Sequence, residues 1–189
     1  MSQVKPVCRP LIDALIDQLL QQAEQLGVQP VATLHGDLHL KNFLVASNQV
    51  ALIDLDNVCI GSPWQELGSF AASLYYRSLL GEWPLALTER MIQHFHQAYV
   101  HNVNWSLPEP MIRWYTATAL LNERAYRTVT RMKSGGFAVL DDLLRLAAQI
   151  VVGERVIANR KDMFYATKAD TVSTVINDLS RPARSKRME

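Results

Sequence analysis

Two short apolar runs predict a β-hairpin, and this hairpin constrains the fold more than any other feature of the sequence. Residues 43–46 and 50–53 are apolar, and the polar segment 47–49 between them is short enough for a tight turn. Asn42 precedes the first run and Asp54 follows the second. Because a hairpin brings the start of its first strand beside the end of its second, Asn42 and Asp54 are expected to converge on one point.

The residues around the hairpin carry the groups that phosphoryl transfer requires. Residues 34–45 read LHGDLHLKNFLV, which places Asp37 five positions before Asn42. The amide oxygen of Asn42 and the carboxylate of Asp54 are hard ligands that suit Mg²⁺. Asp37 is then free to accept a proton from an attacking hydroxyl, or to orient it. A metal clamp on phosphates and a carboxylate that positions the nucleophile are the parts of a phosphotransferase site.

The segments HGDLHLKN and ALIDLDNVCIGSPWQELGSF resemble the catalytic loop and metal segment of the aminoglycoside phosphotransferase and choline kinase families. Their fold is similar to that of protein kinases, and they use ATP to phosphorylate hydroxyl groups of small molecules. The resemblance implies that Asp37 is the catalytic base and that Asn42 and Asp54 bind Mg²⁺ or Mn²⁺. Gly36 and His39 stand where protein kinases commonly carry Arg and Lys, which matches the small-molecule branch.

Four other polar residues of these segments are expected to support the site. His35 and His39 are expected to be structural, holding the loop by packing and hydrogen bonds. Lys41 reads as a solvated lysine, although its position would also allow a phosphate contact. Asp56 either supports the metal ligands or hydrogen-bonds the turn after the strand, and the sequence leaves both alternatives open.

The sequence departs from the family pattern at Glu66. The family usually has an aspartate before the leucine of the following helix, and that aspartate tethers the catalytic loop. Here the pair is Glu66-Leu67. Glutamate is one methylene longer, so a tether is still possible, with altered geometry.

A larger departure lies upstream of the catalytic loop. In the kinase fold an N-terminal lobe of strands covers ATP with a glycine-rich loop, a strand lysine and a helix glutamate. Only 34 residues precede His35, and nothing among them resembles these parts. The resemblance therefore covers a C-terminal lobe alone. We expect either that the sequence is a fragment of a longer kinase or that it is a protein without the N-lobe, in which an N-lobe partner or self-association takes its place.

The expected fold class is α+β and mostly α-helical: a protein-kinase-like C-terminal lobe with a small β-hairpin at the catalytic site. A length of 189 residues fits one domain. Apolar spacing predicts helices over 10–26, 64–80, 88–101, 109–133 and 138–158, with another at 170–179. The kinase-like lobe is predicted over 1–165, with catalytic loop 35–42, metal segment 53–63, helical subdomain 64–160, and then a helix and basic tail over 166–189.

Composition narrows the classes of partner. The chain has nineteen Lys and Arg and eighteen Asp and Glu, which gives a net charge of +1. This charge favours neither nucleic acid nor an acidic membrane surface as the binding partner. No apolar run approaches the length of a membrane span. Cys8 and Cys59 lack CxxC spacing, and no signal peptide is visible over residues 1–10. We therefore expect free thiols and a cytoplasmic protein.

The acceptor substrate stays open at this point. Arg124, Arg127 and Arg131 recur at helical spacing, which indicates either an anionic substrate or, more commonly, a solvated helix face. The sequence contains no dense acidic patch of the kind that would bind a polycationic aminoglycoside. His94, His96 and His101 lack the spacing of a metal site.

Three functions compete. The first is the catalytic lobe of an ATP-dependent small-molecule kinase, incomplete on its own. The second is a kinase-like binding or regulatory module that keeps the metal site without turnover. The third is a phosphatase of the haloacid dehalogenase type, with Asp54 as nucleophile and Asp56 as acid/base, but this alternative leaves HGDLHLKN unexplained.

Overall fold

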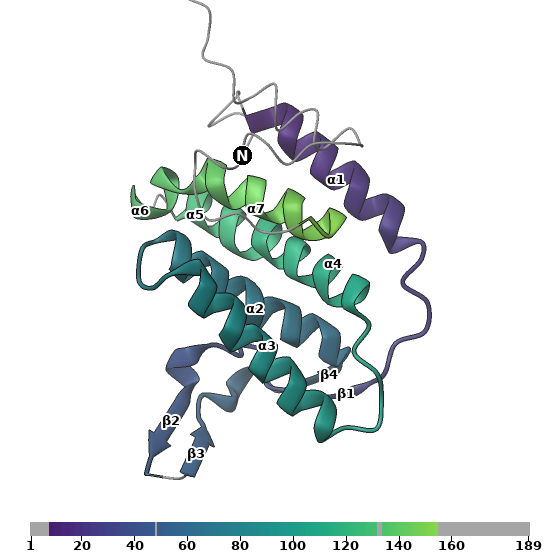
Figure 1. Cartoon of the computed structure of the whole chain (residues 1–189), viewed down its shortest axis with the longest axis vertical. Helices are drawn as coiled ribbons and strands as arrows, with labels where there is room; N and C mark the ends of the chain where they lie inside the picture. The colour runs from purple at the N-terminus through teal and green to yellow at the C-terminus, as the bar shows by residue number, and fades with distance from the viewer. Residues whose placement is uncertain (1–7, 48, 132–133, 155–189) are drawn as a thin grey trace, which may run out of the picture.

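Helix α2 (Pro63–Leu79) lies at the centre of the fold in this computed structural model, which describes residues 8–47, 49–131 and 134–154 (Figure 1). Proline at the first helical position suits the first turn, where no backbone donor is needed. The helix packs closely on α4 (Glu109–Ala119) at Gly68. A Cβ at Gly68 would lie 2.5 Å from the Tyr115 Cβ atom and 2.8 Å from the Thr116 nitrogen. Glycine therefore sets the separation of these two helices.

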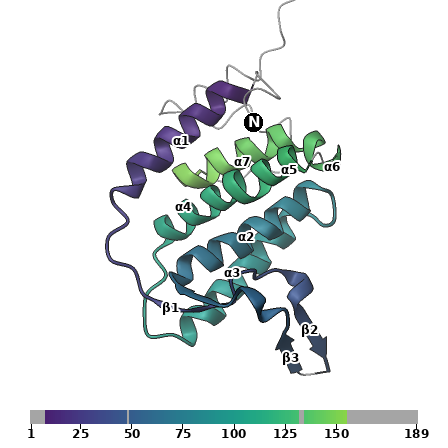
Figure 2. The same ribbon diagram turned by 180° about the vertical axis from the view of Figure 1, so that it is seen from behind.

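The main hydrophobic core lies on the other side of α4, between α1 (Arg9–Ala23) and α7 (Leu140–Val152). Leu15 of α1 and Leu144 of α7 are each fully buried there, as is Leu120, which directly follows α4. Most residues of α7 are buried, which is expected for a helix with neighbours on several sides. Figures 1 and 2 show α1, α7, α4 and α2 side by side from both directions.

Two small antiparallel sheets lie at the opposite end of the molecule from α1 (Figures 1 and 2). Strands β2 (Phe43–Ala46) and β3 (Gln49–Leu52) form the predicted hairpin, with Phe43 opposite Leu52. Strand β1 (Ala32–Leu34) pairs with β4 (Cys59–Gly61), with Thr33 opposite Ile60. The pairing of β1 with β4 was not predicted from the sequence. This pairing connects the chain before the catalytic loop to the chain after the hairpin.

The predicted helix over 109–133 is wrong as a single regular helix. After α4 the chain forms a π-helical segment, η4 (Leu120–Ala125), and then α5 (Tyr126–Thr130). Leu120 and Ala125 are both fully buried, so the wider turn keeps the two ends of the segment against the core. Apolar spacing alone does not reveal such a change of period.

Other helix boundaries differ by a few residues. Helix α1 ends at Ala23 rather than at 26, because residues 25 and 26 form tighter turns and Gly27 has φ +54°. Helix α3 (Leu85–His101) begins three residues earlier than predicted. The predicted break at 134–136 is a short helix, α6 (Ser134–Ala138). The predicted helix 138–158 is observed as α7, and residues from 155 onward lie outside the described part of the chain.

The architecture is thus mostly helical with small antiparallel sheets, which agrees with the expected α+β class. The predicted helix at 170–179 and the basic tail lie outside the described residues. None of the helices described here has the length and apolar character needed to cross a bilayer.

Gly68→Ala is expected to lower the free energy of unfolding by about 1–3 kcal/mol, because the added methyl group overlaps the backbone of α4. Gly135→Ala is the matched control, since its Cβ would meet only the Leu80 Cδ2 atom, at 3.9 Å, and alanine favours a helix. Chemical denaturation of both variants measures the effect. A Gly68→Ala variant as stable as the parent chain would contradict the close approach.

Candidate functional site

The backbone of Ile53 connects the loop at residues 35–42 to the end of the hairpin. The backbone N–H of Ile53 donates to the Asn42 carbonyl at 3.0 Å. The Ile53 carbonyl in turn lies 2.9 Å from the His35 Nε2 atom, which donates to it when that nitrogen carries the proton. His35 is buried, so this contact is shielded from water. The structural role predicted for His35 is consistent with this arrangement.

Asn42 is oriented by the backbone of the same loop. Its side chain is buried, and its Nδ2 atom donates to the Asp37 carbonyl at 3.0 Å. Because the amide nitrogen is used in this way, the amide oxygen is the atom left to accept from, or coordinate, a further group. Asn42 therefore presents the oxygen that a hard metal ligand requires.

Asp54 follows β3 in a left-handed backbone conformation, with φ 63° and ψ 58°. Such a conformation is uncommon for a residue with a side chain and is found more often at functional sites. Within the described residues, the exposed Asp54 carboxylate has no hydrogen-bond or ion-pair partner. The hydrogen bond between Ile53 and Asn42 places the two predicted metal ligands at the same end of the hairpin.

The donor set at the hairpin base fits Mg²⁺ or Mn²⁺ chemically. It consists of the free amide oxygen of Asn42 and the free carboxylate of Asp54. Mg²⁺ is commonly held by few protein oxygens and completes its coordination with water and phosphates. In the described part of the chain no cluster of three or more His, Cys, Asp or Glu side chains forms a metal site.

Asp37 points into a separate cavity of about 560 Å³ beside the loop. Its side chain is 46% exposed, and its Oδ2 atom lies 3.6 Å from the Nε2 atom of His39. His39 thus contacts the predicted base directly. The cavity is lined by residues of the loop, of η3 (Leu55–Asn57), of α2 and of the η4–α5 segment: Gly36, Asp37, His39, Leu40, Lys41, Asn57, Ser73, Tyr76, Arg77, Arg124, Arg127 and Arg131.

Two arginines of this cavity are held by neighbouring carboxylates. Arg77 contacts Glu82 at 2.6 Å, and its guanidinium lies 5.1 Å from the centre of the Trp83 ring. Arg124 lies 3.4 Å from Glu123. Both arginines therefore have a carboxylate partner, although neither carboxylate lines the cavity.

Burial lowers the pKa of Arg124 from its ordinary value, and Arg127 lowers the pKa further, whereas Glu123 and Asp37 oppose this shift. The Arg124 Nε atom is buried without a hydrogen-bond partner among the described residues. An unsatisfied buried donor is costly, so an acceptor brought into the cavity would be favoured there.

Glu66 makes the contact that its position in the sequence suggested. The Gly36 backbone N–H donates to the Glu66 Oε1 atom at 2.7 Å. Gly36 has φ +81°, and a Cβ at this position would lie 2.0 Å from the Asn57 carbonyl oxygen. The longer glutamate thus reaches the catalytic loop, and the glycine allows η3 to pack directly against it.

Several predicted residues are not brought to the Asp37 cavity. Asp56 lies in η3, is exposed, and does not line this cavity. His94, His96 and His101 lie on α3 and do not line this cavity. Sequence reasoning missed Ser73 and Arg77, whose i, i+4 spacing on α2 was the available signal.

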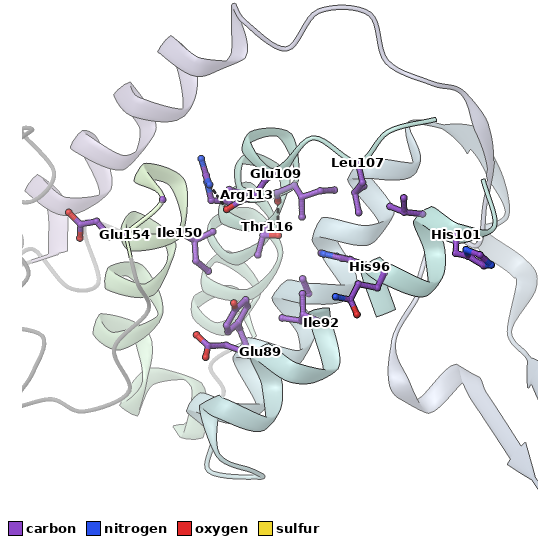
Figure 3. Close-up of a pocket in the computed structure, with 16 residues that line it drawn as sticks. Glu89, Ile92, His96, His101, Leu107, Glu109, Arg113, Thr116, Ile150 and Glu154 are labelled. Carbon is purple, nitrogen blue, oxygen red and sulfur yellow. Dashed lines mark hydrogen bonds and ion pairs between the residues drawn. The ribbon is translucent and has the colours of Figure 1, made fainter. Parts of the chain in front are cut away.

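A larger cavity, of about 810 Å³, lies between α2, α3, α4 and α7 (Figure 3). None of the predicted catalytic or metal-binding residues lines it. Burial raises the pKa of Tyr75 to about 12, with a further contribution from Glu89, and burial lowers the pKa of His96. Figure 3 shows Glu109 beside Arg113, and the two are joined at 2.6 Å. Of these two cavities, the smaller one contains Asp37 and the other loop residues.

Comparison with known proteins identifies a family. The model of a family described as Phosphotransferase enzyme family (APH) matches residues 2–105. The matched stretch contains the loop, the hairpin, Asp54 and α2. No curated protein and no solved structure matches the chain.

Glu66→Ala is expected to free the Gly36 amide and to lower the free energy of unfolding by about 1 kcal/mol, the usual net worth of one hydrogen bond. Glu66→Gln keeps an oxygen acceptor and is the matched control. Amide hydrogen exchange at Gly36, followed by NMR, measures the contact directly. Unchanged protection of Gly36 in the alanine variant would show that Glu66 does not tether the loop.

Proposed function

This chain belongs to the phosphotransferase enzyme family, and on that premise we propose that it supplies the catalytic lobe of an ATP-dependent kinase acting on the hydroxyl group of a small molecule. One observation carries the proposal. The hydrogen bond from the Asn42 amide to the Asp37 carbonyl joins the predicted metal ligand to the predicted base. It leaves the Asn42 oxygen and the Asp37 carboxylate available on the same loop.

Asp37 is the catalytic base in this proposal. The acceptor hydroxyl oxygen bonds to the γ-phosphorus of ATP, the bond from that phosphorus to the bridging oxygen breaks, and ADP leaves. The hydroxyl proton passes to the Asp37 carboxylate. His39, whose Nε2 atom lies 3.6 Å from that carboxylate, orients it. Positioning of this kind, rather than covalent chemistry, is the main contribution of a kinase.

Asn42 and Asp54 would hold Mg²⁺ or Mn²⁺ through their side-chain oxygens. When bound, the metal supplies charge neutralisation for the phosphates. The left-handed backbone at Asp54 turns the chain two residues after the end of β3. The hydrogen bond from the Ile53 N–H to the Asn42 carbonyl holds that turn against the loop. Lys41 lines the Asp37 cavity and is exposed, so it is free to contact phosphate.

The apolar surface of the hairpin supports a second, nucleotide-covering element. Val45 and Val50 face each other across the hairpin and are 71% and 64% exposed. Exposed apolar residues in such a group mark interaction surfaces. We propose that a strand-rich lobe or partner covers this face, and that isolated copies of the chain pair through it. A non-catalytic binding module is the alternative function.

Asp54→Ala is expected to abolish Mn²⁺ binding, because it removes the one carboxylate proposed as a ligand. Asp37→Asn should leave Mn²⁺ binding nearly intact, because its proposed role is toward the acceptor hydroxyl. Relaxation of water protons by Mn²⁺ measures both variants, with and without ADP. ADP should tighten metal binding in the parent chain, since its phosphates complete the coordination shell.

Activity separates the two candidate functions. In a preparation that turns over ATP, Asp37→Asn should lower kcat by roughly 10²–10⁴, the usual contribution of a positioned general base. Equal loss of Mn²⁺ in the Asp37 and Asp54 variants would make Asp37 a ligand. Mn²⁺ binding without turnover, even when a strand-rich lobe is present, would favour the binding module.

Val45→Thr combined with Val50→Thr is expected to reduce self-association of the isolated chain, because the pair forms the centre of the apolar hairpin face. Leu20→Thr is the control, since Leu20 is 63% exposed on α1, at the other end of the molecule. Analytical ultracentrifugation over a range of concentrations measures the effect. A parent chain that stays monomeric at high concentration would contradict association through the hairpin.

A further inference from the structure

The cavity that contains Asp37 is strongly basic, although the chain as a whole carries a net charge of only +1. Its lining includes five Lys and Arg side chains and one carboxylate, that of Asp37. We propose that this cavity binds a small acceptor that carries an anionic group, a phosphate or a carboxylate, in addition to the hydroxyl. This inference rests on the proposed function, because it names the substrate class of the same site.

Three of the five cations are available to a ligand. Glu82 pairs with Arg77, and Glu123 pairs with Arg124. Across residues 8–47, 49–131 and 134–154, no carboxylate pairs with Lys41, Arg127 or Arg131, which are all exposed. Three unpaired cations around one cavity favour an anion, and arginine binds phosphate and carboxylate through a planar, bidentate contact.

The helical segment that carries the arginines supplies a second, independent observation. Arg124 lies in the π-helical segment η4, and π-helical turns occur frequently at functional sites. Its buried Nε donor lacks a partner within the described residues. Arg127 and Arg131 follow on and beyond α5, and all three side chains line the same cavity as Asp37. The arrangement therefore presents donors to a ligand held beside the proposed base.

The position of the cavity assigns the anion to the acceptor rather than to the nucleotide. Neither Asn42 nor Asp54, the proposed ligands for the metal of ATP, lines it. Asp37 does line it, so a hydroxyl held there would face the base while its anionic group meets Arg127 and Arg131. A cationic acceptor such as an aminoglycoside would meet like charge instead.

Three probes of similar size test the inference on the full chain: glycerol 3-phosphate, glycerate and uncharged glycerol. Calorimetry at low salt should detect the two anions and no binding of glycerol, and the stronger anion identifies the phosphate or carboxylate class. R127Q and R131Q should each weaken anion binding about tenfold. R9Q is the matched control, because Arg9 is an exposed arginine on α1 that contacts Asp13 at 3.5 Å.

The outcomes are separable from those of the proposed function. Absence of anion binding, or equal weakening by R9Q, would overturn the inference. Displacement of bound glycerol 3-phosphate by Mg²⁺–ADP in simple competition would assign the arginines to the nucleotide and would also overturn it. Anion binding that depends on Arg127 and Arg131 in a chain without any Mn²⁺ response would support the anion site and contradict the phosphotransfer function alone.

Discussion

The candidate site depends on the backbone of Ile53, whose N–H and carbonyl both make contacts to the loop. The Ile53 N–H donates a hydrogen bond to the Asn42 carbonyl, and the Ile53 carbonyl is within hydrogen-bond distance of the buried His35 ring. The hairpin is only four residues long on each side and is largely exposed, so it has little packing of its own to fix its angle. The Ile53 contacts supply that constraint, and they set Asp54 relative to the loop that carries Asp37.

Helix α2 connects the loop that carries Asp37 to the helical part of the molecule. Near its start Glu66 holds the Gly36 amide, and near its end Arg77 lines the cavity that contains Asp37. Its position against α4 is set by the close contact at Gly68. The loop, the basic cavity and the main core are thereby connected through a single rigid element, which suits a site that works by positioning.

Local patterns predicted the parts of this fold that neighbouring residues determine. The hairpin and the apolar face of α1 follow from short-range spacing, and the structure confirms both. Strand β4 was missed because its partner β1 is distant in the sequence and its pattern is weak. The arginine spacing at 124, 127 and 131 was visible, but only tertiary packing shows that this helix face meets Asp37. The roles of Asp37, Asn42 and Asp54 remain predictions.

Gly36 and Asn57 restrict the order in which this sequence can change. Any side chain at position 36 would overlap the Asn57 carbonyl oxygen, which would lie 2.0 Å from the new Cβ atom. That oxygen belongs to the backbone, so no substitution at position 57 removes the overlap directly. A side chain at position 36 becomes tolerable only after changes elsewhere have moved the 55–57 segment. Position 36 is therefore coupled to the backbone of the 55–57 segment, so the effect of a side chain at position 36 and the effect of changes that move this segment should be non-additive.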